Sequence, residues 1–291
     1  MAEAHGYYLP EKARWPIFGS IGLFLTMTGI STYLIGQGFG SWLIVLGLLT
    51  ILFMMVGWFR EVISESLAGI YSDEVGRSFR LGMIWFIVSE VCFFGAFFGS
   101  LFYIRAFVSD WLTGTGDWTG VGLFTHEILY PDFKEFWPTN GPGHVGGKFE
   151  PMEAWGIPAL NTLILLSSGG TVTWAHWGLL KNDRSQFIKG LIATIALGVL
   201  FLLLQGYEYG RAYREMGLTL GAGIYGSLFF MLTGFHGFHV TIGAIFLSVV
   251  LGRALKGHFD PEHHFAFEAA AWYWHFVDVV WLFLFIFVYW L

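Results

Sequence analysis

The C-terminal segment of the chain, from His263 to Leu291, is long enough and apolar enough to cross a lipid bilayer. About 20 helical residues, each rising 1.5 Å, cover the roughly 30 Å hydrocarbon core of a membrane. The segment nevertheless carries His275 and Asp278 inside its apolar run. Because ionisable groups are costly at that depth, we expect both side chains to face protein rather than lipid. This pattern is typical of an inner helix of an integral membrane protein.

Composition excludes a soluble protein. Of the 291 residues, 55% are hydrophobic and only 12% are charged, whereas soluble chains carry about 25% charged residues. The mean hydropathy of +0.62 agrees. Nothing in the chain is basic enough to suggest nucleic-acid binding. The single cysteine, Cys92, excludes an intramolecular disulfide. Acidic residues and a proline precede the first apolar run, so a cleavable signal peptide is not expected.

Apolar runs of spanning length predict an all-α, polytopic membrane protein with seven transmembrane helices. Only residues 38–40 separate the first two runs, which predicts a tight helical hairpin, and small residues such as Ser41 and Ser227 would let helices approach closely. The predicted spans are 17–38, 41–59, 81–107, 156–178, 188–206, 223–253 and 271–291.

The expected organisation follows from these spans. It comprises an N-terminal segment (1–16), a two-helix arm (17–59), an inner interfacial helix (60–80) and a five-helix bundle (81–291) with a long outer loop (108–155). With the N-terminus inside, ten of the 15 Lys and Arg residues lie on the inner side, as the positive-inside rule requires. The C-terminus and the acidic loop then lie outside. The Gly- and Pro-rich stretch 137–147 excludes regular structure there.

Glu90 is the most informative single residue because it lies about 14 Å into the third span, near the predicted midplane. Ser89 is its only local hydrogen-bonding neighbour. An ionised carboxylate would be costly there, so we expect Glu90 to be protonated or paired. Two interpretations stay open: a proton-accepting or gating site, and a neutral acid bonded to a neighbouring helix for packing.

His236 and His239 lie three residues apart on one face of the sixth span. They could bind a metal or a haem, or they could partner Glu90, which should lie at a similar depth. A metal site needs three or four convergent ligands, and no second helix offers a matching histidine pair. The sequence therefore favours structural histidines and predicts no metal site.

Two further groups of polar residues lie in the last span or just before it. His275 and Asp278 share a face, which predicts a fixed imidazole–carboxylate pair, with a proton role as the alternative. His263, His264 and Glu268 precede this span and are interpreted as an interfacial cluster that meets lipid phosphates or a partner subunit, since adjacent histidines diverge by about 100° on a helix. Nearby tryptophans are expected to anchor the interface and pack closely against helices: Trp272, Trp274 and Trp281.

A group of arginines flanks the inner ends of the second and third spans. Arg60, Arg77 and Arg80, with Trp58, could hold phospholipid head groups. The alternative is that they only follow the positive-inside rule. The chain contains no Gly-rich phosphate loop, nucleophile elbow, CxxCH haem motif or HExxH motif, and Cys92 alone cannot build a dinuclear copper site.

Five strings in the chain resemble subunit III of the haem–copper cytochrome c oxidases. They are GWFREVISES from Gly57, SEVCFFGAFFGSLFY from Ser89, LNTLILLSSGGTVTWAHW from Leu160, YGSLFFMLTGFHGFHVTIGAIFL from Tyr225 and HHFAFEAAAWYWHFVDVVWLFL from His263. The resemblance covers roughly residues 57–291 with its spacing kept, and WYWHFVDVVWLFL is not a generic hydrophobic pattern.

The resemblance implies a seven-helix subunit in which a two-helix arm and a five-helix arm form a V-shaped cleft that holds phospholipids. Such a subunit carries no haem or copper. It packs against catalytic subunit I, with subunit II nearby, in a complex that holds haem a and copper and takes electrons from cytochrome c. It supports proton uptake, protects the catalytic subunit and has been linked to oxygen access. The family's membrane acid falls on Glu90 and its cleft tryptophan on Trp58.

Some features qualify the resemblance. Tyr71-Ser72 stands where the family often has a His-Thr pair, so the resemblance implies no role for these two residues. The long acidic loop resembles bacterial members, which implies a multi-pass protein of the bacterial inner (plasma) membrane with a cytoplasmic N-terminus and a periplasmic C-terminus. The alternatives are subunit III of a quinol oxidase, which typically lacks the first two helices, a free-standing proton or solute carrier, and a membrane haem protein using His236 and His239.

Overall fold

The computed structural model describes residues 8, 14–115, 124–134 and 137–291. Within these ranges the chain is helical and contains no strand. It divides into two compact units, residues 1–81 and 82–291. The all-α class is confirmed, while the V-shaped arrangement of the two arms stays a prediction. Of the predicted N-terminal segment 1–16, most residues lie outside the described ranges.

The first unit is built on a helical hairpin, α1 (Trp15–Leu34) and α2 (Gly40–Leu67). Glycines at the contact bring the two backbones together, because a Cβ atom on Gly29 would lie 2.6 Å from the backbone N of Ile44. A Cβ atom on Gly40 would lie 2.5 Å from the backbone N of Tyr33. The tight hairpin is therefore confirmed. Ser41 is exposed, and its hydroxyl donates to the Gly38 carbonyl at 3.0 Å.

The predicted interfacial helix over 60–80 is not a separate helix. Its first part extends α2 to Leu67, and its last part begins α3 (Asp73–Tyr103). Residues 61–68 contain no Gly or Pro, so α2 continues beyond its apolar run. It ends where Gly69 adopts φ +69° and the Ile70 N–H reaches back to the Glu65 carbonyl at 3.4 Å, which is the Schellman arrangement of a helix C-terminus.

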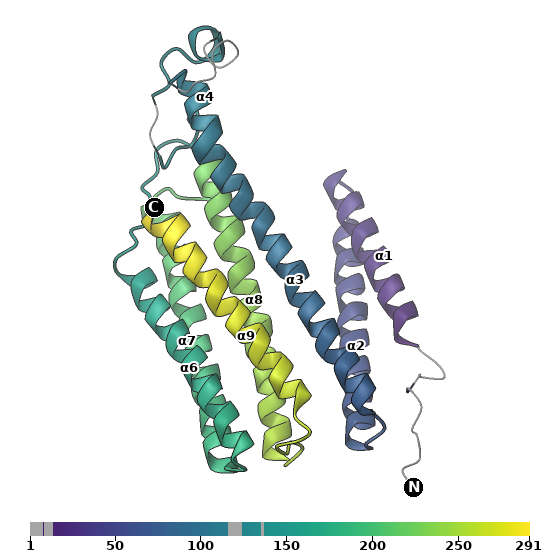
Figure 1. Cartoon of the computed structure of the whole chain (residues 1–291). Coiled ribbons are helices and arrows are strands. Elements are labelled where there is room, and N and C mark those ends of the chain that lie inside the picture. Colours follow the sequence, from purple (N-terminus) through teal and green to yellow (C-terminus); the bar gives the residue numbers. More distant parts are fainter. Residues whose placement is uncertain (1–7, 9–13, 116–123, 135–136) are drawn as a thin grey trace. The chain divides into compact units, whose positions relative to one another are not determined.

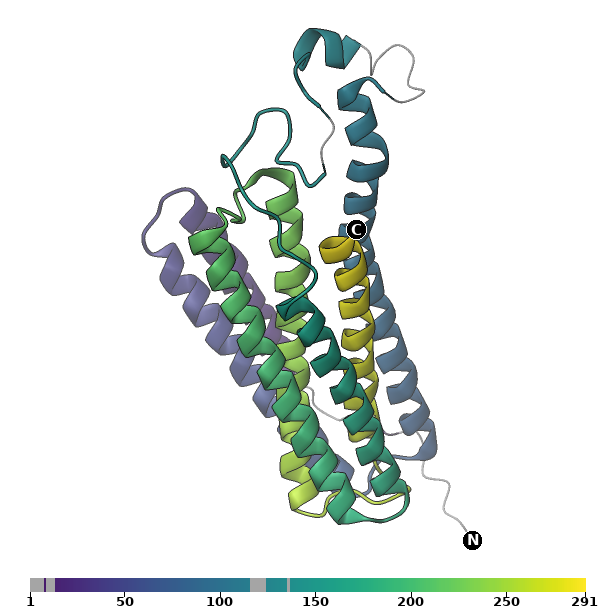
Figure 2. The same ribbon diagram turned by 90° about the vertical axis from the view of Figure 1, so that its left-hand side faces the viewer.

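Most of the second unit is a helical bundle, shown in two views in Figures 1 and 2. Antiparallel α6 (Ile157–Leu180) and α7 (Arg184–Glu215) pack side by side, α8 (Gly223–Leu255) packs on α7, and α9 (Phe265–Leu284) packs on α6 and α8. The last helix continues as η3 (Phe285–Trp290). From α3, the Phe93 ring meets the Phe235 ring of α8 at a centroid distance of 4.9 Å.

The segment after α3 is only partly irregular. It contains η1 (Ile104–Val108), α4 (Ser109–Thr113) and, farther on, η2 (Thr125–Leu129). The stretch 137–147 contains only turns and bends, as its glycines and prolines predict.

Among the described residues, six helices are long and apolar enough to span a membrane: α1, α2, α3 through α4, α7, α8 and α9 through η3. The seventh predicted span, 156–178, forms the helix α6 but is not among these six. Ser, Thr, Gly, Asn and His residues lower its hydropathy, and several of them, such as Asn161 and Ser168, are fully buried against neighbouring helices.

Two tryptophans of α9 form the centre of the bundle rather than an interface anchor. Trp274 and Trp281 have no exposed surface. Their indole N–H groups donate to Ser168 Oγ and Thr162 Oγ1, each at 2.9 Å. The prediction of interface anchoring is therefore wrong for both, whereas the predicted close packing is confirmed. Trp272 is partly exposed.

Candidate functional site

Glu90 of α3 and His239 of α8 form a direct pair, with Glu90 Oε2 lying 2.8 Å from His239 Nε2. His239 lies halfway along α8. The Glu90 side chain is 20% exposed and the His239 side chain is 9% exposed. Aromatic rings enclose the imidazole, with the Phe94 ring centroid at 5.0 Å and the Tyr273 ring stacked at 6.3 Å. The sequence allowed His239 to bind a metal, a haem or Glu90, and in the structure it contacts Glu90.

The other imidazole nitrogen of His239, Nδ1, determines how many protons the Glu90–His239 pair carries. His239 Nδ1 lies 2.6 Å from the Phe235 carbonyl oxygen, which can only accept, so Nδ1 carries a proton. One further proton is then shared between Nε2 and the Glu90 carboxyl. The pair is neutral overall whether this proton resides on nitrogen or on oxygen. This geometry explains how a carboxyl group is accommodated deep in an apolar helix.

His236 does not join this pair. Its Nε2 atom lies 3.1 Å from the Val277 carbonyl oxygen of α9, and its Nδ1 atom has no partner among the described groups. Its ring packs against Phe201 and Trp281 at centroid distances of 5.6 and 5.2 Å. Within the described residues, no group of three or more His, Cys, Asp and Glu side chains is placed to hold a metal ion.

His275 and Asp278 face one another on α9, with Nδ1 and Oδ2 separated by 3.7 Å. The Nε2 atom of His275 lies 3.3 Å from Thr173 Oγ1 on α6. The predicted pair is thus present, although its distance makes it a loose ion-pair contact rather than a hydrogen bond. Asp278 is buried, whereas nearly half of the His275 side chain is exposed.

His263 and His264 lie in the loop before α9, and Glu268 lies in the first turn of that helix. Sequence reasoning missed the residue that orders this loop, Asp260. Its Oδ1 atom accepts the backbone N–H groups of Glu262 and His263 at 2.8 and 2.6 Å. The backbone N–H of His263 is the largest cause that lowers the pKa of Asp260. The His264 Nδ1 atom lies 3.2 Å from the Asp260 backbone carbonyl oxygen, and its ring packs on His176 at a centroid distance of 5.5 Å.

The predicted lipid-binding residues that flank the second and third spans belong to the first unit. Trp58 is 53% exposed, Arg60 and Arg77 are exposed, and Arg80 is partly buried. Sequence reasoning missed a neighbouring cluster in which Glu65 accepts the hydroxyl groups of Tyr8 and Tyr71 at 2.8 and 2.6 Å.

In this cluster Tyr71 donates a hydrogen bond to Glu65. Burial and, secondly, the hydrogen bond to Glu65 raise the pKa of Tyr71. Tyr71 is thus a hydrogen-bond donor to Glu65.

A second buried acid also escaped the sequence analysis. Glu208 of α7 is 1% exposed, and its Oε2 atom accepts the Tyr289 hydroxyl at 3.4 Å. Gln205, one turn earlier, donates to the same hydroxyl oxygen at 3.3 Å. The sequence feature that indicates this buried polar pair is the i, i+3 spacing of Gln205 and Glu208 near the end of an apolar run.

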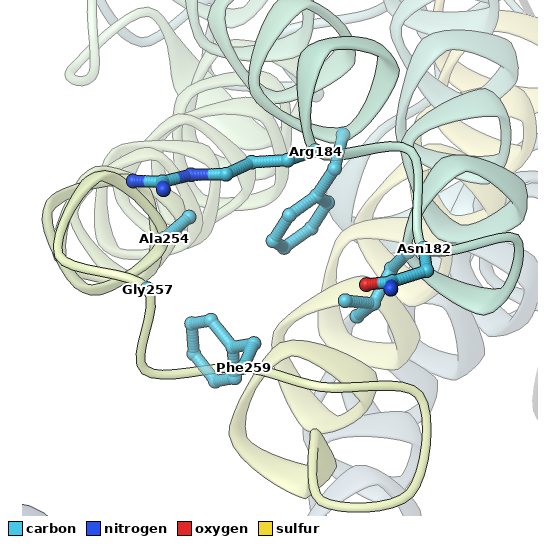
Figure 3. A pocket seen from close by; sticks show the side chains of 7 residues that line it. Asn182, Arg184, Ala254, Gly257 and Phe259 are labelled. Carbon is cyan, nitrogen blue, oxygen red and sulfur yellow. The ribbon is translucent and has the colours of Figure 1, made fainter.

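A small pocket of about 60 Å³ lies where the α6–α7 turn meets the loop after α8 (Figure 3). Arg184 extends past Ala254 in this view, and its Nη2 atom donates to the Leu255 carbonyl at 2.8 Å. The arginine therefore caps the C-terminal end of α8, where a cation is favourable. We assign this pocket a structural role.

The sequence profile of the family described as Cytochrome c oxidase subunit III matches residues 5–133 and 124–291 of the chain. This chain belongs to the cytochrome c oxidase subunit III family. It is 43% identical over 293 residues to Cytochrome c oxidase subunit 3 of Marchantia polymorpha, covering 100% of this chain and 98% of that protein. It is also 43% identical over 292 residues to the protein of the same name from Sus scrofa, covering 99% and 98%.

Family membership, with the six membrane-length helices, makes the chain a multi-pass subunit of a respiratory oxidoreductase complex. The other subunits of that oxidase are its implied partners.

Proposed function

We propose that this chain is the non-catalytic core subunit III of a proton-pumping cytochrome c oxidase, the terminal enzyme of aerobic respiration. The observation that carries the proposal is the match to family members along the whole chain. In this proposal haem a and copper belong to partner subunits I and II, and cytochrome c delivers electrons to the complex. The subunit stabilises the catalytic subunit.

The histidine contacts support a role without redox cofactors of its own. His236 and His239 engage a backbone carbonyl and a carboxyl group, respectively, instead of converging on a common point. Binding a metal through either Nε2 atom would require breaking one of these contacts inside the bundle. A metal centre also needs several convergent ligands, which neither residue is positioned to provide.

The Glu90–His239 pair supports a part in proton uptake. It retains one proton in an apolar environment, and the 20% exposed fraction of the Glu90 side chain leaves part of the pair on the surface of this chain, where the catalytic subunit can contact it. We propose that this pair assists proton uptake by the catalytic subunit rather than forming an obligatory step. Among the described residues, no further titratable group extends it into a chain of hydrogen bonds.

The exposed side chains of the first unit support a lipid-binding role. Trp58, Arg60 and Arg77 combine an amphipathic ring with two guanidinium groups, which is the chemistry that phospholipid head groups bind. We propose that these residues, together with Arg80, retain phospholipid and that this lipid helps to protect the catalytic subunit and to provide oxygen access. His263, His264 and Glu268 would form a second contact with lipid or a neighbouring subunit.

The proposed location is the inner (plasma) membrane of a bacterium, with the N-terminus in the cytoplasm and the C-terminus in the periplasm. The Lys and Arg distribution supports this orientation. A quinol oxidase is the alternative complex. The presence of α1 and α2 favours a cytochrome c oxidase, because the related quinol oxidase subunits typically lack these helices.

Native extraction tests the proposal. The tagged chain is expected to co-purify with subunits that bind haem and copper, while the chain expressed alone shows no Soret absorbance. Purification without any haem-bearing partner would contradict the assignment. A Soret band from the isolated chain would favour the membrane haem protein, and solute or proton uptake by the isolated chain in liposomes would favour the carrier.

A further inference from the structure

Three buried polar side chains of α6 and α7 contain atoms without hydrogen-bond partners. Asn161, Gln205 and Glu208 are each at most 5% exposed. Among the described groups, neither amide atom of Asn161 has a partner, and the same holds for Gln205 Oε1 and Glu208 Oε1. Nearly every buried polar atom in a native protein has a partner. These four atoms therefore call for a ligand that can both donate and accept hydrogen bonds.

The pairing of α6 with α7 brings these side chains to one level of the bundle. The two antiparallel helices lie side by side (Figures 1 and 2), and Thr171 Oγ1 of α6 lies 2.8 Å from Thr194 Oγ1 of α7. Asn161 comes ten residues before Thr171, and Leu204 comes ten residues after Thr194. Because both helices rise by the same amount per residue, Asn161 lies level with Leu204 and its neighbour Gln205.

Helical periodicity places the polar groups on the facing sides of the two helices. Gly190 of α7 faces α6, because a Cβ atom on it would lie 2.7 Å from Ala175 Cβ. Glu208 follows Gly190 by 18 residues, which is five turns, so it lies on the same side of α7. Asn161 precedes Ala175 by 14 residues, close to four turns, so it lies on the α7-facing side of α6. The unpartnered atoms thus gather at the contact between α6 and α7.

The surroundings of Glu208 favour a protonated carboxyl group. Its Oε2 atom accepts the Tyr289 hydroxyl at 3.4 Å. Arg211, one turn further along α7, is 46% exposed and pairs with Glu215 at 3.5 Å. Within the described residues, no cation forms an ion pair with Glu208. A carboxylate buried without a cation is costly, and such a group takes up a proton instead. The Oε1 atom can then donate.

We propose that Glu208 is a second buried proton-binding site of the chain, and that ordered water bridges its Oε1 atom to Gln205 and Asn161. Water accepts from the Glu208 O–H and the Asn161 N–H groups, and it donates to the amide oxygens of Gln205 and Asn161. Buried water typically makes about three such hydrogen bonds. A cation would leave the Asn161 N–H groups unpartnered. The site is distinct from the Glu90–His239 pair and lies within the second unit.

Infrared spectroscopy of the natively purified complex tests the proton. Glu208→Gln nearly keeps the shape of the side chain. We expect the wild-type-minus-variant spectrum at neutral pH to contain the C=O stretching band of a protonated carboxylic acid. Glu215→Gln is the matched control on the same helix, because Glu215 is exposed and paired with Arg211, so this variant should lose carboxylate bands instead. Loss of carboxylate bands in Glu208→Gln would overturn the proposal.

A cryo-electron-microscopy map of the wild-type complex, at a resolution that shows ordered water, tests the ligand without any substitution. We expect water density within hydrogen-bonding distance of Glu208 Oε1 and of the amide groups of Gln205 and Asn161. A map in which Asn161 bonds directly to Glu208 or Gln205, with no water between them, would contradict the proposal.

Asn161→Leu links the two measurements, because it removes the amide group while nearly keeping the shape of the side chain. The bridging water then loses a partner, so the hydrogen bond from the Glu208 O–H weakens. We expect the carboxylic-acid band to shift to a higher wavenumber. A band at the wild-type position in an assembled variant would show that water does not connect the two residues. The wild-type map decides the question if this variant fails to assemble.

Discussion

At the scale of single residues, the role of the membrane acid Glu90 depends on its partner, His239. From the sequence alone, Glu90 could be either a proton-accepting site or a neutral acid that serves helix packing. The contact with His239 Nε2 at 2.8 Å, combined with the Phe235 carbonyl on the other ring nitrogen, makes the pair neutral with one shared proton. The two interpretations are therefore compatible, because a neutral pair that packs well also retains an exchangeable proton.

Replacing Glu90 tests how much of its role is chemical. Glu90→Gln should preserve assembly, since the Gln amide can donate to His239 Nε2 with nearly the same shape. We expect proton uptake to slow by less than about threefold, which is a barrier increase of under ~0.7 kcal/mol. Stopped-flow proton uptake by the purified complex measures this rate. Loss of turnover in a fully assembled complex would show that the shared proton is essential.

Glu90→Leu is the contrasting variant because it leaves the His239 nitrogen without a partner. A buried unpaired group costs about 1–3 kcal/mol, so the thermal stability of this variant should fall below that of Glu90→Gln. Equal stability of the two variants would mean that the 2.8 Å contact contributes little to folding.

At the scale of elements, close helix contacts depend on glycines and on polar groups that bond across helices. Backbone proximity in the α1–α2 hairpin requires Gly29 and Gly40. In the α6–α9 contact, Ser168 and Thr162 accept the indole N–H groups of two buried tryptophans. Lipid provides no hydrophobic force between helices, so such contacts determine which helices associate.

The hairpin contact predicts a clear stability difference between two glycines of the same helix. Gly29→Ala places a Cβ atom 2.6 Å from the Ile44 backbone N, which must shift, so we expect a loss of about 1–3 kcal/mol. In the control Gly19→Ala, the new atom meets only Met54 Cε at an ordinary 3.5 Å. Thermal unfolding of the two purified variants measures the difference. Equal unfolding temperatures would mean that the two helices separate without cost.

At the scale of the whole molecule, the two units have different surfaces. The first unit exposes most of its apolar side chains together with Trp58 and its arginines, whereas the second buries a continuous core around α9. A unit with so little internal core needs lipid or protein against its surface to remain folded in a membrane. This difference supports the proposal that bound lipid belongs to the working structure.

Removing two of the arginines tests the lipid proposal. Replacing Arg60 and Arg80 together by alanine should release bound phospholipid and shorten the catalytic lifetime of the complex, because the guanidinium groups no longer hold head groups. Lipid content by mass spectrometry and the time course of turnover measure both effects. The control replaces two exposed lysines of the second unit, Lys181 and Lys189, by alanine. Unchanged lipid content in the arginine variant would contradict the proposal.

The sequence by itself determined the all-helical membrane class, a tight hairpin between the first two spans and the oxidase family, although the turn lies at residues 35–39 rather than 38–40. Apolar run length and specific strings such as WYWHFVDVVWLFL are local properties of the chain. The apolar-run criterion did not determine that α2 extends to Leu67, because the end of the apolar run does not end the helix and no Gly or Pro follows before Gly69.

Only the tertiary structure decided that His239, and not His236, contacts Glu90, that Trp274 is core, and that one buried oxygen of Asp278 has no hydrogen-bond partner among the described groups. Partners on different helices depend on the rotation and depth of each helix. Those quantities are set by packing between segments far apart in the chain, which one-dimensional periodicity does not contain.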